Sequence, residues 1–321
     1  MSKAADVQFR RAHDLFSKVA AKSRLTAPEV KSRLVQVRRP AYWRELNPEL
    51  SVTDHFDMRA IRARKISAAE RRSALQNLKS AGYFQIDDLY PASLMQRLKR
   101  GVEIIQQNDW PPMFVYIYDE YWLLKRSPSL VGLLDEALGP DHLELRNSWC
   151  HYIQPIPGAH GWAPHMDGPN LEGRMSVWFP LTDATLDNGC IYIIPENRVP
   201  ASMVENFNSG RRTDRAHLRV LLQAAKALPV RSGSLLAWNF RVPHWGSTAG
   251  TTTQPRVSIT TEFARADAPD ISFDCLPIES HTTIPTFDVR LEIIGRAIQA
   301  FQTFEPKMVR WAELASHLWK R

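Results

Sequence analysis

The sequence predicts a mainly β fold with flanking helices, in which short strands form a sandwich or barrel. From Leu143 onward, β-rich runs are separated by Pro, Gly and Asn, a spacing typical of an all-β core. Helical periodicity precedes and follows this region. The motif His165-Met166-Asp167 is followed 79 residues later by His244, and a closed β scaffold is the kind of fold that brings such distant residues together.

Length and composition place the chain among soluble globular proteins. Its 321 residues, 44% of them apolar, suit one large domain with extensions or two modest ones. No run approaches the roughly 18 consecutive apolar residues of a membrane span, and Met1–Leu25 lacks the apolar segment of a secretory signal. Cys150, Cys190 and Cys275 have neither disulfide-framework nor zinc-site spacing. We therefore expect a cytoplasmic protein with inert thiols and no membrane partner.

The N-terminal part carries the positive charge. Residues 1–72 hold 17 Lys and Arg against 8 Asp and Glu, whereas the remainder is close to neutral. Because the charges are scattered and no nucleic-acid-binding motif accompanies them, we interpret them as a solvated helical face or an oligomer contact, and we expect no nucleic-acid partner. Homodimerisation through the N- or C-terminal helices stays an open alternative.

The elements before the β-rich region follow from local signals. Residues 1–65 are expected to form a helical and irregular extension. Ser67 and Glu70 have the spacing of a capping box, which predicts a helix that ends near Gly82. A short strand is then expected over 83–86, and a helix over 91–107.

The remaining elements complete a three-part organisation. The expected strands are Met175–Leu181, Cys190–Ile194, Ser234–Phe240 and Val257–Phe263. A last stretch from Val289 has helical periodicity and is expected to pack back onto the body. The parts are a basic N-terminal extension (1–65), a catalytic domain (66–268) and a C-terminal helical segment (269–321). Glu205–Lys226 lies in a long insertion, where we expect a lid.

The His-x-Asp motif indicates a metal site. Alternate residues of a strand point to the same face, so His165 and Asp167 would bind one ion while Met166 faces away. Two imidazoles and one carboxylate form a facial triad suited to Fe(II), which leaves other coordination positions open. The same ligands also suit a hydrolytic zinc site, so both metals remain candidates on this evidence.

Several motifs, in a specific order, resemble one known family. They are Ala81-Gly82-Tyr83, Pro155-Ile156-Pro157-Gly158, Pro164-His165-Met166-Asp167-Gly168, Val177–Ala184, Asp187–Cys190, Ile193-Ile194-Pro195, and His244-Trp245-Gly246 followed by Arg256. Over approximately residues 73–265 the chain resembles the phytanoyl-CoA dioxygenase (PhyH)-like Fe(II)/2-oxoglutarate-dependent oxygenases. The resemblance implies a double-stranded β-helix (jelly-roll, cupin-like) core.

The resemblance also implies roles for individual residues. His165, Asp167 and His244 match the iron ligands, and Arg256 matches the residue that binds the distal carboxylate of 2-oxoglutarate. Trp178 and Gln154 fall near positions that line the co-substrate pocket in relatives. A planar guanidinium suits this carboxylate, and Ser258 would share the strand face of Arg256 and add a hydroxyl. The alternatives are a surface salt bridge for Arg256 and a solvent-facing residue for Ser258.

The implied activity is that of a dioxygenase that uses Fe(II), 2-oxoglutarate and O₂. We expect it to hydroxylate an unactivated C–H bond of a small-molecule metabolite, in specialised or catabolic metabolism, with release of succinate and CO₂. Desaturation or cyclisation can follow the same first step, whereas Asp167 argues against a halogenase. Two alternatives are a non-catalytic jelly-roll binding module and an oxygenase that docks a macromolecule on its basic N-terminal region.

The residues near the metal motif suggest two features of the substrate site. Relatives usually have Gly-Ser-His after the Ile-Pro pair, whereas this chain has Glu196-Asn197-Arg198. Arg198, Arg174 and Arg241 would suit an anionic substrate, although exposed arginines explain them equally well. His151 and His160 flank the metal motif, where a structural role and a substrate contact are both reasonable expectations.

Overall fold

The computed structural model describes residues 24–53, 55, 57–168, 172–208, 215–269, 275–276, 282–302 and 304–319. The α-helices are α2 (Ala27–Val37), α3 (Pro40–Leu46), α4 (Ala68–Ala81), α5 (Ala92–Gln107), α6 (Asp119–Leu124), α7 (Pro128–Leu138), α8 (Ala201–Asn208), α9 (Arg215–Ala224), α10 (Phe287–Phe301) and α11 (Ala312–Leu318). Short 3-10 helices are η1 (Met58–Ala60), η2 (Pro112–Ile117), η3 (Glu196–Arg198) and η4 (Pro306–Trp311). The strands are β1 (Tyr83–Ile86), β2 (Leu143–Ile153), β3 (Arg174–Pro180), β4 (Ile191–Ile193), β5 (Lys226–Leu228), β6 (Leu235–Asn239), β7 (His244–Gly246) and β8 (Arg256–Ala264).

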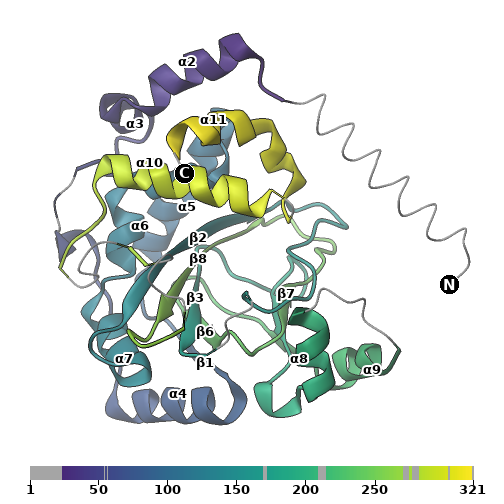
Figure 1. The fold of residues 1–321 in the computed structure, drawn as a ribbon. Coiled ribbons are helices and arrows are strands. Elements are labelled where there is room, and N and C mark those ends of the chain that lie inside the picture. The colour runs from purple at the N-terminus through teal and green to yellow at the C-terminus, as the bar shows by residue number, and fades with distance from the viewer. Residues whose placement is uncertain are drawn as a thin grey trace, which may run out of the picture.

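Two antiparallel sheets form the centre of the molecule. The larger has the strand order β1-β6-β3-β8-β2, and the smaller has the order β5-β4-β7. Figure 1 shows α10 and α11 on one side of this centre and α4 on the opposite side. Because many of these strands are far apart in the chain, each sheet brings together residues that the sequence separates.

Period-two alternation gives the large sheet two different faces. On β8, Val257, Ile259 and Phe263 belong to the main apolar core, together with residues from the helices. The alternate residues Arg256 and Ser258 point to the other face, as the strand geometry requires. The helices therefore cover an apolar face, and the polar residues of the same strand are left for the space between the sheets.

The local predictions for the first part of the core are confirmed. The Ser67 hydroxyl accepts from the Glu70 amide and the Glu70 carboxylate accepts from the Ser67 amide, which completes the capping box of α4. Gly82 ends the helix in the left-handed region (φ 82°), which glycine adopts without steric strain. Strand β1 has the predicted bounds, and α5 begins one residue after the predicted start.

The strands confirm a sheet core with flanking helices, but the expectation of a mainly β chain is wrong. Helices contain more of the described residues than strands do. Helix α6 has no amphipathic signal in the sequence, because Asp119, Glu120 and its four apolar residues are all buried and its pattern has no exposed polar face.

Buried charges connect α6 to the sheet. Glu144 on β2 forms ion pairs with Lys125 at 2.6 Å and with Arg126 at 2.8 Å, and all three side chains are at most 1% exposed. Arg290 of α10 likewise pairs with Asp119, and both side chains are at most 4% exposed. Such pairs fix the helices in place, since removing one partner leaves an uncompensated buried charge.

The two ends of the described chain pack together. Helix α2 contacts α11, and the Leu25 amide donates to the Arg310 carbonyl. Arg33 pairs with Asp109, and Arg38 donates to the His317 carbonyl, so these basic side chains contact the chain's own acceptors. No helix among the described residues is long and apolar enough to cross a membrane.

Candidate metal centre

Three side chains converge at one end of the space between the sheets. The Nε2 atoms of His165 and His244 lie 3.6 Å and 3.5 Å from Oδ1 of Asp167. One ligand atom from each residue lies within 4.8 Å of the other two. A single metal ion is the natural occupant of such an arrangement.

Backbone pairing joins the two parts of this cluster. His165 and His244 form an isolated antiparallel bridge, with amide-to-carbonyl distances of 3.1 Å and 2.9 Å. His244 begins β7, but His165 and Asp167 do not lie on a continuous strand as expected. The chain instead turns after Asp167, where Gly168 has φ 78° and its amide donates to the Met166 carbonyl. The two side chains still reach the same site because the bridge fixes His165 and the turn directs Asp167.

Each imidazole is oriented by a hydrogen bond to a backbone carbonyl two residues earlier. Nδ1 of His165 lies 2.7 Å from the Ala163 carbonyl oxygen, and Nδ1 of His244 lies 3.1 Å from that of Val242, each two residues earlier. A carbonyl only accepts, so Nδ1 carries the proton and Nε2 presents its lone pair. Burial also lowers the pKa of His165 to about 4, so this imidazole is neutral at pH 7.

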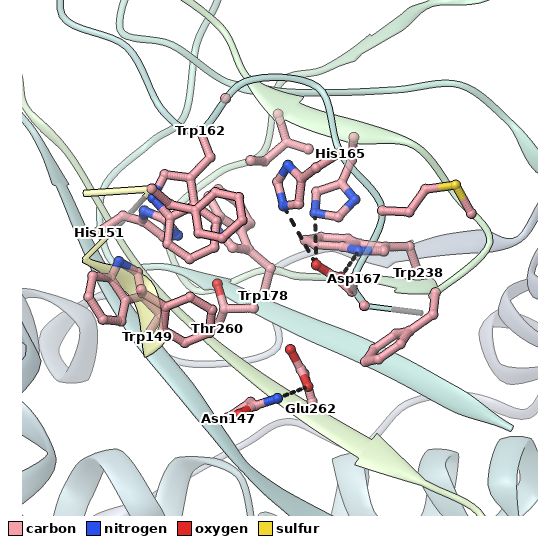
Figure 2. Close-up of a pocket in the computed structure, with 18 of the residues that line it drawn as sticks. Asn147, Trp149, His151, Trp162, His165, Asp167, Trp178, Trp238, Thr260 and Glu262 are labelled. Carbon is pink, nitrogen blue, oxygen red and sulfur yellow. Dashed lines mark hydrogen bonds and ion pairs between the residues drawn. The ribbon is translucent and has the colours of Figure 1, made fainter. Parts of the chain in front are cut away.

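Two hydrogen bonds orient the carboxylate of Asp167. Its Oδ2 accepts from the Ser176 hydroxyl at 2.7 Å and from the Trp238 indole at 2.9 Å, so Oδ1 is the oxygen that faces the imidazoles (Figure 2). Burial favours a higher pKa for Asp167, but the neighbouring imidazoles and these hydrogen bonds outweigh it and hold the pKa below its usual value. The group is therefore an anionic ligand.

A buried cation lines the same cavity. Arg256 is 1% exposed, and its Nη1 donates to the Ser258 hydroxyl at 3.1 Å. Its Nε has no hydrogen-bond partner, and no described carboxylate forms an ion pair with it. Burial lowers its pKa to about 10. Since a buried guanidinium is costly without an anion, this position is suited to an anionic ligand.

Two glycines make room for this guanidinium. A Cβ atom on Gly161 or on Gly246 would lie 2.9 Å from Nη2 of Arg256. It would also lie 2.8 Å from the Cα atom of the other glycine. The close approach of these two segments is therefore possible only without side chains.

The cavity has a volume of about 340 Å³, and aromatic rings form much of its wall (Figure 2). Trp178, predicted from the resemblance, lies here with its ring centroid 5.9 Å from the Arg256 guanidinium carbon. His151 also lines the cavity, whereas His160 and Gln154 are exposed and do not. Gln154 follows the last residue of β2, where the chain leaves the sheet.

Sequence reasoning missed several residues of the site. The ring centroid of Trp162 lies 5.0 Å from that of Phe301 and 5.2 Å from that of Phe304. Phe301 is the last residue of α10, and Phe304 lies just beyond it. No local signal could have placed them at the cavity. Ser176 is different, because it alternates with Trp178 along β3 and the strand period puts both on one face.

Of the three arginines that would suit an anionic substrate, Arg174 lines the cavity and Arg198 and Arg241 do not. Arg241 pairs with Glu196 at 2.7 Å, and Arg198 does not line the cavity. Arg174 does line it, and its Nη2 donates to the Pro269 carbonyl at 2.8 Å. The insertion expected to form a lid contains α8 and α9, neither of which contributes a cavity residue among those described; Gly210-Arg211-Arg212 lies outside the described residues.

Comparison with known proteins agrees with this geometry. Residues 117–258 match the family model for phytanoyl-CoA dioxygenase (PhyH), a stretch that includes the triad and Arg256. This stretch is PhyH-like. The resemblance inferred from the sequence motifs is thereby confirmed over residues 117–258. No curated protein matches the sequence.

Solved structures similar to this chain are non-heme enzymes. The epimerase SnoN, in complex with Fe3+, alpha ketoglutarate and nogalamycin RO, has a TM-score of 0.52 at 16% identity, covering 68% of this chain and 97% of SnoN. The carbocyclase SnoK has a TM-score of 0.50 at 17% identity, with coverage of 68% and 97%. The monooxygenase ThoJ, in its Ni complex, has a TM-score of 0.52 at 13% identity, with coverage of 73% and 99%. At these identities the likeness concerns the fold.

Proposed function

We propose that this protein is an Fe(II)/2-oxoglutarate-dependent oxygenase that hydroxylates an unactivated C–H bond of a small-molecule metabolite. One observation carries the proposal: a preoriented two-histidine, one-carboxylate cluster and a buried arginine with an unpaired Nε line the same aromatic cavity. A metal hydrolase needs the cluster but has no use for the buried cation. The combination is the one that 2-oxoglutarate requires.

In the proposed site, Nε2 of His165, Nε2 of His244 and Oδ1 of Asp167 hold the iron. Their remaining polar atoms already have partners, so the ligand atoms need no rearrangement. The carbonyl contacts of both Nδ1 atoms select the tautomer in which Nε2 faces the metal position, and one carboxylate supplies a single negative charge. This charge leaves the site net positive with Fe(II), which favours a further anionic ligand.

The guanidinium of Arg256 would bind the distal carboxylate of 2-oxoglutarate. The Ser258 hydroxyl holds Nη1 in place, and Nε remains available for a second hydrogen bond. The indole N–H of Trp178 is likewise buried without a partner and lines the same cavity. These donors match an acceptor-only carboxylate in number and in character.

When bound, the iron and 2-oxoglutarate supply the activation of O₂, with succinate and CO₂ as the co-products. The protein positions the reacting C–H bond and excludes water. Trp162, Phe301 and Phe304 form an apolar cover beside His165, since the rings of Phe304 and His165 lie 6.3 Å apart. Desaturation and cyclisation remain outcomes of the same proposal, because they begin at the same C–H bond.

The fold supports a finer architectural proposal. The large and small sheets enclose the cavity between them, with Trp178 and Trp238 from one and Ile191 and His244 from the other. We propose that they form a double-stranded β-helix within a catalytic domain of residues 66–268. The segment 269–321 would then complete the cavity through Phe301 and its neighbours.

The first experiment is anaerobic titration with Fe(II) and then 2-oxoglutarate, observed through the weak visible charge-transfer band of the chelate. We expect the band in the wild type and in His160→Ala, and its loss in His244→Ala. His160 is the matched control because it is exposed and does not line the cavity. Metal binding without a band would favour the zinc hydrolase, and binding of neither would favour a non-catalytic module. Succinate release then serves to screen substrates.

A further inference from the structure

One wall of the cavity is built by alternate residues of two neighbouring strands. On β8, Thr260 and Glu262 continue the face that begins with Arg256 and Ser258, and all but Ser258 line the cavity. On β2, Asn147, Trp149 and His151 line it as well. The register pairs Trp149 with Thr260 and His151 with Ser258.

An irregularity in β2 places Asn147 at the far end of this wall. The β2/β8 register shifts between Glu144 and Ser148, so three residues of β2 lie opposite Glu262 alone. Such bulges redirect a side chain and are frequent beside active sites. Here the amide of Asn147 donates to Oε2 of Glu262 at 2.9 Å. The bulge thus supports a polar pair inside a cavity whose wall contains many aromatic rings.

The wall is polarised along its length. Arg256 and Glu262 are six residues apart on β8, which corresponds to about 20 Å of strand. The cationic end suits 2-oxoglutarate under the proposed function. Figure 2 shows Asn147 and Glu262 on the opposite side of the cavity from His165 and Asp167. A substrate that lies between these ends would meet aromatic rings along its body and acceptor oxygens at its far end.

We propose that Glu262 and Asn147 are the specificity-determining end of the substrate site. The site would take a small molecule with an apolar body and a hydrogen-bond donor, an ammonium or hydroxyl group, that reaches the Glu262 carboxylate. The chemistry is complementary, because a carboxylate only accepts and aromatic faces favour cations and C–H surfaces. The inference rests on the proposed function and replaces the expectation of an anionic substrate. Arg174 lies in the same cavity, with Nη2 on the Pro269 carbonyl.

The test uses six probes on two rings: tryptamine, tryptophol and indole-3-acetate, and phenethylamine, phenethyl alcohol and phenylacetate. Binding to protein loaded with Fe(II) and 2-oxoglutarate is measured by anaerobic calorimetry. We expect an amine or alcohol to bind at least about tenfold more tightly than the carboxylate on the same ring, the effect of one charge-assisted hydrogen bond. In Glu262→Gln this preference should fall below about threefold. A preference limited to the amine identifies an amine substrate, and equal binding of the alcohol identifies a polyhydroxylated one.

Two variants complete the design. Glu136→Gln is the charge-matched control, because Glu136 pairs with Arg71 on the surface and does not line the cavity. Asn147→Ala provides a second test that does not depend on the folding of Glu262→Gln. It should weaken binding of the preferred amine or alcohol probe several-fold and leave the affinity for the carboxylate probes unchanged.

Three results would overturn the proposal. The carboxylate probes could bind as tightly as the amines and alcohols or more tightly, which would assign this end of the cavity to Arg174. Alternatively, Glu262→Gln could keep the wild-type preference, or no probe could bind. Its failure can be told apart from that of the proposed function. The chelate band should form normally in Glu262→Gln, since Glu262 supplies no ligand atom to the iron and no donor to 2-oxoglutarate in the proposed site. An absent band with a retained amine or alcohol preference would refute the oxygenase and leave the recognition site standing.

Discussion

Replacing Arg256 by Met separates the roles of this residue in function and in stability. The side chain is 1% exposed, its Nε has no partner, and its Nη1 donates to the Ser258 hydroxyl. A buried guanidinium with so few partners does not contribute favourably to folding by itself. Methionine has a similar length without the charge, so the substitution should leave the thermal stability of the metal-free protein equal or higher.

The same substitution should strongly weaken 2-oxoglutarate binding. Each hydrogen bond between charged groups contributes about 1.5 to 3 kcal/mol, and the unpartnered Nε of Arg256 supplies one to the distal carboxylate in the proposed site. The loss is therefore about 1.5 to 3 kcal/mol, which raises the Kd for 2-oxoglutarate by roughly one to two orders of magnitude. Binding of Fe(II) should change little, since Arg256 supplies no ligand atom.

Anaerobic titration of the charge-transfer band measures the Kd for 2-oxoglutarate, and differential scanning calorimetry measures stability. Arg241→Met is the control, because this exposed arginine pairs with Glu196 outside the cavity and should alter neither quantity. A Kd for Arg256→Met within threefold of the wild type would refute the assigned role. A large loss of stability with unchanged binding would instead show that the arginine is structural.

Further predictions concern the ligands, the packing and pH. Ser176→Ala removes a hydrogen bond to Asp167 and should raise the Kd for Fe(II) about tenfold, measured by competition with a chelator. Gly246→Ala places a Cβ 2.9 Å from Arg256 Nη2 and should abolish 2-oxoglutarate binding in the band titration, while Fe(II) still binds. Glu144→Gln leaves two buried cations poorly paired and should lower the free energy of unfolding by roughly 3 to 5 kcal/mol in urea titration. Because the pKa of Arg256 is lowered to about 10, its charge is present below that pH and lost above it, so the Kd for 2-oxoglutarate should rise as pH increases through about 10.

Each of these has a contrary outcome. Unchanged iron affinity in Ser176→Ala would mean that Trp238 alone suffices to orient the carboxylate. Normal co-substrate binding in Gly246→Ala would show that the two glycine segments can separate. Glu144→Gln with wild-type stability would contradict the buried ion cluster. A pH-independent Kd up to pH 11, in protein that remains folded by circular dichroism, would show that Arg256 keeps its proton there.

Elements and residues with local signals could be predicted from the amino-acid sequence alone. The capping box of Ser67 and Glu70 defines the start of α4, because both partners lie within one helical turn. Gly82 defines its end through a backbone conformation that other residues avoid. Alternation along β8 likewise placed Arg256 and Ser258 on one face, because a strand has period two whatever it packs against.

The surroundings of the site depend on tertiary packing and could not be predicted from local signals. His165 pairs with His244 through an isolated bridge rather than a strand, and the carbonyl that orients each imidazole becomes visible only in three dimensions. Phe301 reaches the cavity from a helix that begins 43 residues after His244. Glu262 accepts a hydrogen bond from Asn147, which lies 115 residues earlier in the chain, beside the bulge in β2. These contacts depend on how helices and sheets pack, which is governed by the shape and burial of whole surfaces rather than by any short segment.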